Sequence, residues 1–162
     1  MSFAPQHILV PVDVDPVADI VLAELVVDAA VALARRLGAK VTLLHVARPV
    51  LAPMTPPMEM VDISYQTVLE IEAMRNKNAD EKLQKLEARA ADAGVIVDHV
   101  LDVRPGSVPK AIVETAIAQG ADLIVISSHG RRGIQRLLLG SVAERTAHLS
   151  PIPVLLLPPE AH

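Results

Sequence analysis

The residues with the clearest chemical potential lie between positions 127 and 141, where the chain reads SSHGRRGIQRLLLGS. Glycines at 130, 133 and 140 accompany three arginines and the hydroxyl of Ser141. Glycine lets backbone N–H groups turn toward an anion, and the start of a helix adds partial positive charge. The stretch therefore predicts a phosphate-binding loop, with a solvated basic loop as the structural alternative.

Other phosphate and catalytic motifs do not fit this stretch. No lysine follows Gly140, as a Walker A loop requires, and the leading G-x of a dinucleotide fingerprint is missing before Gly130. Ser128 and His129 are adjacent, without a nucleophile-elbow pattern or an evident acid partner. We therefore expect no catalytic residue, and any turnover should be slow.

The histidines show no close ligand spacing along the chain. We therefore expect no metal site made by protein side chains. A divalent ion carried in by phosphates, Mg²⁺ or Mn²⁺, remains compatible with the sequence.

Asp13 directly follows a short apolar run at residues 7–12. The next acidic residue, Asp15, precedes Pro16, and this pair is typical of a helix N-cap with proline at the first helical position. With Asp15 assigned to the cap, Asp13 is the carboxylate expected to accept hydrogen bonds from a ribose or an amine. A plain turn aspartate is the alternative.

The elements that must position these residues repeat one pattern. Apolar strands are expected at residues 7–12, 41–46, 95–100, 121–126 and 153–157. Helices are expected between them and end at Gly38, near Gly94 and at Gly120, with a last helix at 141–149. This alternation predicts an α/β fold: a doubly wound, five-stranded parallel sheet, Rossmann-like, with helices on both faces, in one domain over residues 1–162. The proline-rich segment 49–57 is expected to be a connecting loop.

In such a sheet, ligands bind beyond the carboxyl ends of the strands, where the strand order reverses. If the first and fourth strands are neighbours, Asp13 and the 127–141 loop face each other across that crevice. The sequence therefore predicts the site there.

Composition narrows the function classes. The net charge of −4 and the two aromatic residues argue against a nucleic-acid partner. The most apolar long segment, 17–37, contains Asp19, Glu24 and Asp28, so it is not expected in a membrane. There is no cysteine, and residues 1–6 do not resemble a secretory signal, so a cytoplasmic location is expected.

The chain resembles the universal stress protein family. Its ATP-binding members carry G-x2-G-x9-G-[S/T] after the fourth strand, and Gly130, nine residues and Gly140-Ser141 match the later part of that motif. The runs ILVPVD at 8–13, LARRLGA at 33–39 and PVL at 153–155 are also similar to the family. Ser127 stands in place of the first motif glycine, and Val14-Asp15 stands where the family often has Gly-Ser.

The resemblance implies an ATP-binding, stress-linked regulatory protein that forms a homodimer through its fifth strand, Val154, Leu155, Leu156 and Leu157. It implies adenine and ribose contacts at Asp13 and Val41, and phosphate contacts in the glycine loop and at the start of the last helix. The complete predicted nucleotide site is Pro11, Val12, Asp13, Val41, Ser127, Gly130, Arg131, Gly140, Ser141 and Val142.

Ser127 leads to a specific expectation. If the backbone there must adopt a positive φ, serine carries about 1 kcal/mol of strain, and Ser127→Gly should tighten ATP binding. Two other functions remain open: a nucleotide-free dimeric interaction protein of the same family and, with less support, an adenylyl-transfer enzyme. The latter usually needs an H-x-G-H element near the first strand, which residues 7–20 lack.

Overall fold

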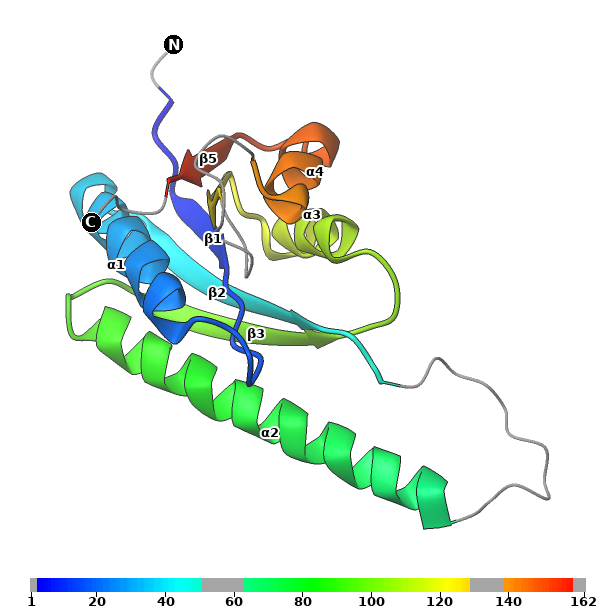
Figure 1. Cartoon of the computed structure of the whole chain (residues 1–162). Helices are drawn as coiled ribbons and strands as arrows, with labels where there is room; N and C mark the ends of the chain where they lie inside the picture. Colours follow the sequence, from blue (N-terminus) through cyan, green and yellow to red (C-terminus); the bar gives the residue numbers. More distant parts are fainter. Residues whose placement is uncertain (1–2, 51–62, 129–138, 159–162) are drawn as a thin grey trace.

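The structure is a computed structural model that describes residues 3–50, 63–128 and 139–158 (Figure 1). Strands and helices alternate along the chain, as the sequence predicts. The strands are β1 (His7–Pro11), β2 (Lys40–Ala47), β3 (Val97–Val103), β4 (Leu123–Ser127) and β5 (Val154–Leu157). The helices are α1 (Ile20–Leu37), α2 (Ile63–Ala91), α3 (Val108–Gln119) and α4 (Ser141–Leu149). Most of the proline-rich segment predicted as a loop lies outside the described residues.

The five strands form one sheet in the order β3-β2-β1-β4-β5, and every pairing is parallel. The chain therefore builds outward from β1 through β2 to β3, and then returns to the other side of β1 with β4. The strand order reverses between β1 and β4, where Ile8 pairs with Leu123. The predicted doubly wound fold and the predicted neighbourhood of the first and fourth strands are both confirmed.

Successive side chains of a strand point to opposite faces of the sheet, so the strands contribute to two hydrophobic cores, one on each face. Ile8 and Val10 face α1 and α2, whereas Leu9 between them joins the core under α3 and α4. All three are fully buried. Figure 1 shows the two helix pairs on opposite faces of the sheet. Burial on both faces explains why the strands read as continuous aliphatic runs.

The start of α1 differs from the prediction at Asp15-Pro16. Asp19 is the N-cap, and its carboxylate accepts hydrogen bonds from the N–H groups of Val21 and Leu22. Asp15 instead lies in a turn, where its carbonyl accepts from Ala18 N–H at 2.9 Å. Asp15 therefore does not cap α1, and it lines a cleft at the carboxyl edge of the sheet.

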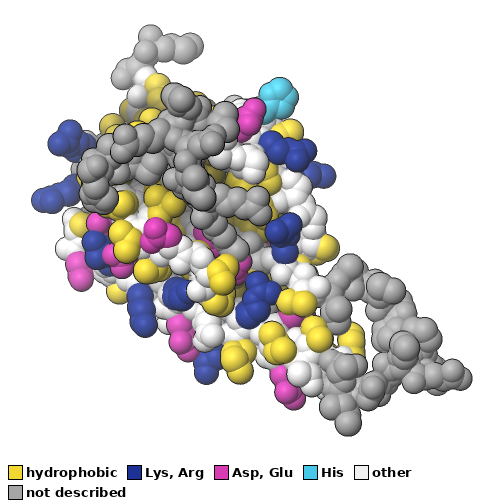
Figure 2. All heavy atoms as spheres, viewed as in Figure 1, with side chains coloured by type: hydrophobic (Ala, Val, Ile, Leu, Met, Phe, Trp, Pro, Cys, Tyr) yellow, Lys and Arg dark blue, Asp and Glu magenta, His cyan; other side chains and the backbone are white. Residues whose placement is uncertain are grey.

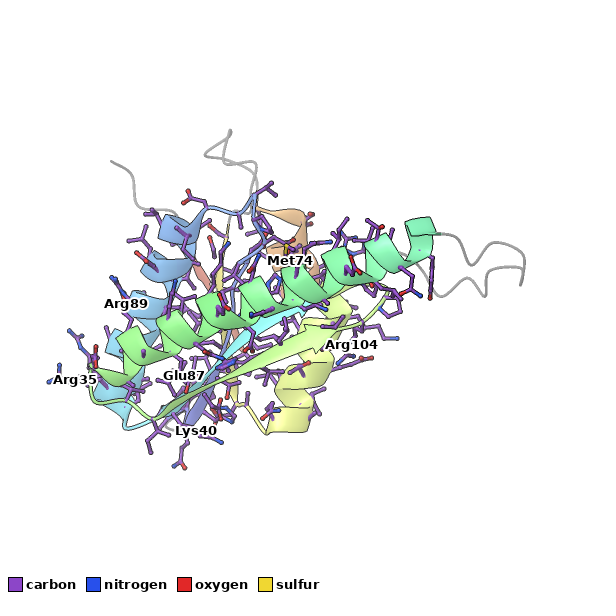
Figure 3. All side chains as sticks on the ribbon, turned by 90° about the horizontal axis from the view of Figure 1, so that it is seen from below. Arg35, Lys40, Met74, Glu87, Arg89 and Arg104 are labelled. Atoms are coloured by element: carbon purple, nitrogen blue, oxygen red, sulfur yellow. The ribbon has the colours of Figure 1, made fainter. Side chains whose placement is uncertain are left out.

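α2 runs along the sheet face beside α1 (Figure 3). Near its end, Arg89 donates hydrogen bonds to both carboxylate oxygens of Asp28 on α1, at 2.9 and 2.7 Å. This hydrogen bonding holds the pKa of Asp28 below its usual value. In the first half of the helix, Met74 is exposed.

The surface carries mixed charge. Figure 2 shows Lys, Arg, Asp and Glu side chains interspersed on the visible face. Among the described residues, no helix combines the length and apolarity needed to cross a membrane.

Candidate functional site

A cleft of about 1160 Å³ opens at the carboxyl edge of the sheet. Its walls come from the ends of β1, β2 and β4, the loop between β1 and α1, and the starts of α1, α3 and α4. This is the position where the reversal of strand order predicts a ligand site. The two halves of the predicted site, Asp13 and the end of the 127–141 segment, line the same cleft.

The lining combines an apolar surface with a few charged groups. Val46 and Ile126 contribute aliphatic side chains from β2 and β4, and Val12 contributes one from directly after β1. Arg48 and Arg75 add positive charge, while Asp13, Asp15 and Asp19 add carboxylates. Such a cleft can hold a flat apolar ring against the strand ends and a polar, anionic group elsewhere.

Most of the predicted site residues that the structure describes line this cleft. They are Pro11, Val12, Asp13, Ser127, Gly140, Ser141 and Val142. Gly130 and Arg131 lie outside the described residues.

Val41 does not line the cleft, and this part of the prediction is corrected. It lies next to the amino end of β2, pairs with Ile8 and Val97, and is buried in the core under α1 and α2. The cleft is at the opposite end of the strand, where Val46 lines it. A parallel strand rises about 3.3 Å per residue, which separates the two positions by roughly 16 Å.

The start of α4 has the geometry expected of an anion site. Gly140 is the N-cap, and it has no side chain that could accept a hydrogen bond from the first-turn N–H groups. Its own N–H donates to the carbonyl of Ser128 at 2.7 Å, and its carbonyl accepts from Glu144 N–H at 2.9 Å. Ser141 and Val142 follow at the exposed first turn. Their N–H groups lie at the positive end of the helix dipole.

Ser127 is the last residue of β4 and is partly buried. No non-glycine residue in the described part of the chain has a positive φ, so the backbone of Ser127 is unstrained. The premise that serine is forced into a left-handed conformation is therefore wrong for this structure.

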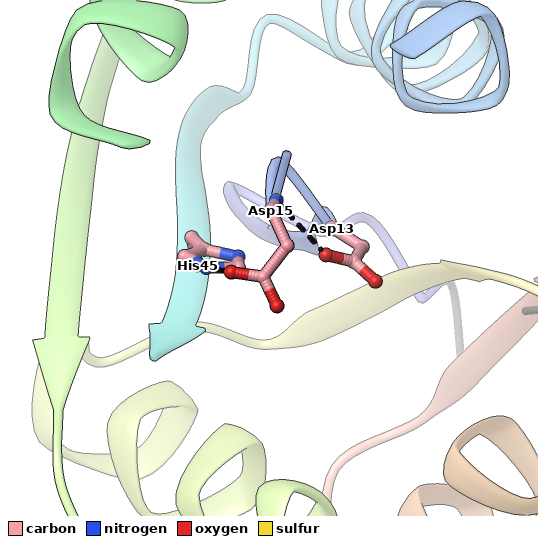
Figure 4. A group of neighbouring side chains, drawn as sticks. All are labelled: Asp13, Asp15 and His45. Carbon is pink, nitrogen blue, oxygen red and sulfur yellow. Dashed lines mark hydrogen bonds and ion pairs between the residues drawn. The ribbon is translucent and has the colours of Figure 1, made fainter. Parts of the chain in front are cut away.

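A cluster that sequence analysis missed lies at the floor of the cleft (Figure 4). Asp13, Asp15 and His45 place possible metal-binding atoms within 4.8 Å of one another. Asp15 N–H donates to Asp13 Oδ1 at 3.1 Å, which ties the Asp13 carboxylate to the backbone of Asp15. His45 comes from β2 and is 3 % exposed. No local motif joins these residues, because strand pairing alone brings His45 beside the β1–α1 loop.

Comparison with known proteins identifies the family. Residues 5–158 match the model of the universal stress protein family. The chain belongs to the universal stress protein family. A Bacillus subtilis relative, Universal stress protein YxiE, is 30% identical over 129 residues, which cover 80% of this chain and 86% of the relative.

Solved structures of this family share the fold. The structure of MJ0577 from Methanocaldococcus jannaschii has a TM-score of 0.75 at 24% identity, covering 99% of this chain and all of its own. A universal stress protein in complex with cAMP has a TM-score of 0.63 at 25% identity, covering 96% of this chain and 98% of its own. One from Archaeoglobus fulgidus in complex with dAMP has a TM-score of 0.60 at 23% identity, covering 95% and 98%.

Proposed function

We propose that this universal stress protein binds ATP in the cleft at the carboxyl edge of its sheet and acts as a nucleotide-dependent regulatory protein. The observation that carries the proposal is the joint lining of one cleft by Asp13 and the Gly140-Ser141 start of α4. These are the two places where the sequence pattern puts ribose and phosphate contacts.

The chemistry of the lining supports a nucleotide. Aliphatic side chains at the ends of β1, β2 and β4 offer a surface for a purine, and Asp13 can accept hydrogen bonds from ribose hydroxyls. Backbone N–H groups at the start of α4 suit phosphate oxygens, because they carry partial positive charge. Structural relatives bound to cAMP and dAMP support an adenine nucleotide as the ligand class.

The proposed role is binding more than turnover. The sequence has no nucleophile-elbow pattern around Ser128 and His129 and no evident acid partner for them, so it does not indicate an activated nucleophile. Any hydrolysis is therefore expected to be slow, and Mg²⁺ or Mn²⁺ would enter with the phosphates.

Calorimetric titration of the purified protein with ATP and Mg²⁺ tests this proposal, with GTP as the base control. Ser141→Ala should weaken ATP binding by about 0.5–1.5 kcal/mol, the typical net worth of one hydrogen bond. Ser107→Ala is the matched control, since Ser107 is an exposed serine at the start of α3 that makes no capping hydrogen bond.

Absence of heat at millimolar ATP would overturn the proposal, and a nucleotide-free interaction protein would then take its place. If Ser141→Ala and Ser107→Ala both bind ATP like the wild type, the start of α4 is structural only. Acid extraction of fresh protein, followed by chromatography, gives an independent check for a nucleotide that co-purifies.

A further inference from the structure

We infer that His45, Asp15 and Asp13 bind a divalent transition-metal ion of the Zn²⁺ or Co²⁺ class at the floor of the cleft. This goes beyond the proposed nucleotide function, because here protein side chains hold the ion and no phosphate is needed. The inference rests on the hydrogen-bonding state of His45, on one distance and on the donor set.

The ring of His45 is fixed by the backbone around it. Its Nδ1 lies 3.0 Å from the carbonyl oxygen of Val12, a contact that requires a hydrogen on Nδ1. The Val14 N–H lies farther from the same nitrogen, at 3.4 Å. A histidine held in this way by a backbone carbonyl presents its other nitrogen as a ligand, which is the usual arrangement around protein-bound metals.

The second nitrogen of His45 is buried and points at a carboxylate (Figure 4). Nε2 has no hydrogen-bond partner among the described residues and lies 3.5 Å from Asp15 Oδ1. With Nδ1 protonated, a neutral ring turns a lone pair toward a negatively charged oxygen. This is unfavourable unless a proton or a metal ion lies between the two atoms.

The distance favours the metal ion. A charge-assisted hydrogen bond between an imidazolium and a carboxylate spans about 2.7–2.9 Å, which is much shorter than the observed separation. An ion bound at about 2.05 Å from nitrogen and about 2.1 Å from oxygen with a tetrahedral angle separates the two atoms by about 3.4 Å. The 3.5 Å between Nε2 and Oδ1 fits this bridging geometry.

Two cations of α2 also lie beside the cluster. Arg75 Nη2 is 3.4 Å from Asp15 Oδ1. Lys82 Nζ donates to the carbonyl of Val14 at 2.9 Å and is 3.4 Å from that of Asp15. Lys82 therefore holds the loop that carries the carboxylates, whereas Arg75 competes with an ion for Asp15. Removal of the Arg75 charge should tighten metal binding.

The donor set selects the class of ion. One imidazole and two carboxylates suit zinc and its first-row neighbours, whereas Mg²⁺ and Ca²⁺ prefer oxygen ligands alone. Three protein ligands leave at least one coordination position open toward the cleft, as in metal sites that bind water or a substrate oxygen.

The test uses tag-free protein treated with a chelator and then dialysed without nucleotide. Titration with Co²⁺ should give visible d–d absorption that saturates at one ion per chain, and Zn²⁺ should displace it. Mg²⁺ at the same concentration should not. No saturable binding of Co²⁺ or Zn²⁺ would overturn the inference and leave an imidazolium–carboxylate pair in its place, without bearing on ATP binding.

His45→Asn is the decisive variant, because an asparagine amide can still donate to the carbonyl of Val12 while Nε2 is lost. It should weaken Co²⁺ binding by more than about tenfold, and Arg75→Gln should strengthen it several-fold. The matched control is His99→Asn, since His99 also lies between two carboxylates, Glu87 and Asp80, but both of its ring nitrogens are engaged.

Circular dichroism and thermal melts confirm that each variant is folded. Equal affinities in wild type and folded His45→Asn would overturn the assignment. Loss of binding in His99→Asn but not in His45→Asn would place the ion at the α2–β3 contact instead. If His45→Asn does not fold, Asp15→Asn carries the same test, with the same weakening expected.

Discussion

Ser127 stands where the ATP-binding family members have a glycine, and its backbone conformation determines what that difference does. The residue ends β4 with a partly buried side chain and an unstrained φ. The serine therefore carries no backbone strain that a glycine could release.

We accordingly predict that Ser127→Gly will not tighten ATP binding. The change should instead lower the free energy of unfolding by about 0.5–1 kcal/mol, because glycine loses more chain entropy when a strand forms. Urea denaturation and an ATP titration of the same preparations measure both effects. Tighter binding by the glycine variant would show that the backbone at this position rearranges when nucleotide binds.

Single residues also show what the sequence could and could not reveal about the site. Gly140 and Ser141 were predictable because a glycine at the start of a helix is a local signal. His45 and Asp15 were not, because only the β1–β2 pairing brings them together. Val41 was assigned from the family resemblance alone. It is the first residue of the predicted 41–46 strand, and the rule that ligands bind beyond the carboxyl ends of strands already favours the other end.

At the level of elements, helix ends and strands were largely predictable. Gly38 and Gly120 end α1 and α3 in the left-handed conformation that glycine adopts most easily, with a φ of 68° at each. The start of α1 was predicted wrongly, because two aspartates that could cap it, Asp15 and Asp19, lie only four residues apart. Pro16 favoured Asp15 as the N-cap in the sequence, whereas Asp19 accepts the capping hydrogen bonds in the structure.

The cap of α1 gives a direct stability prediction. Asp19→Ala removes the acceptor for the N–H groups of Val21 and Leu22 and should cost about 1 kcal/mol of unfolding free energy. Asp19→Asn should retain most of the stability, since asparagine caps helices about as well as aspartate. Equal losses in both variants, measured by urea denaturation, would point to a charge effect rather than a cap.

The contact between α2 and β3 should make stability depend on pH. Burial lowers the pKa of His99, but hydrogen bonds and charge from Glu87 and Asp80 outweigh it, so the net pKa is raised above 6.5. Protonated His99 therefore stabilises the folded state most fully at and below pH 6.5. That contribution should fall as the pH rises above 6.5 through the raised pKa.

Thermal melts between about pH 6 and pH 9 measure this effect. His99→Gln should flatten the decline, and an unchanged profile would contradict the assignment.

His7 provides a contrast, because burial and the charge of Lys40 lower its pKa. The stability that neutral His7 contributes to the folded state should therefore be lost as the pH falls below 6.5, whereas that of His99 is lost as the pH rises above 6.5.

At the scale of the whole molecule, β5 raises the question of assembly. Within the described chain it pairs only with β4, so one edge of the strand is open, and Leu155 on it is 40% exposed. Proteins normally cover or interrupt such edges. We propose that two copies of the chain pair through β5.

Light scattering at micromolar concentration should therefore give the mass of a dimer. Leu155→Lys should shift the protein toward monomer, whereas Leu69→Lys should not, although Leu69 on α2 is also 40% exposed. A monomeric wild type, or the same mass for both variants, would reject pairing through β5.

The contacts of Arg75 and Lys82 connect α2 to the cleft. These side chains reach from an outer helix to Asp15 and Val14 at the cleft, and the same helix packs along β3. A cleft ligand that draws Asp15 away from Arg75 must alter how α2 is held. Linkage between two binding sites is reciprocal. If a protein that binds α2 changes the affinity of the cleft for its ligand, then the ligand changes the affinity of α2 for that protein by the same factor. Binding of another molecule to the exterior of α2 would therefore be coupled to the occupancy of the cleft.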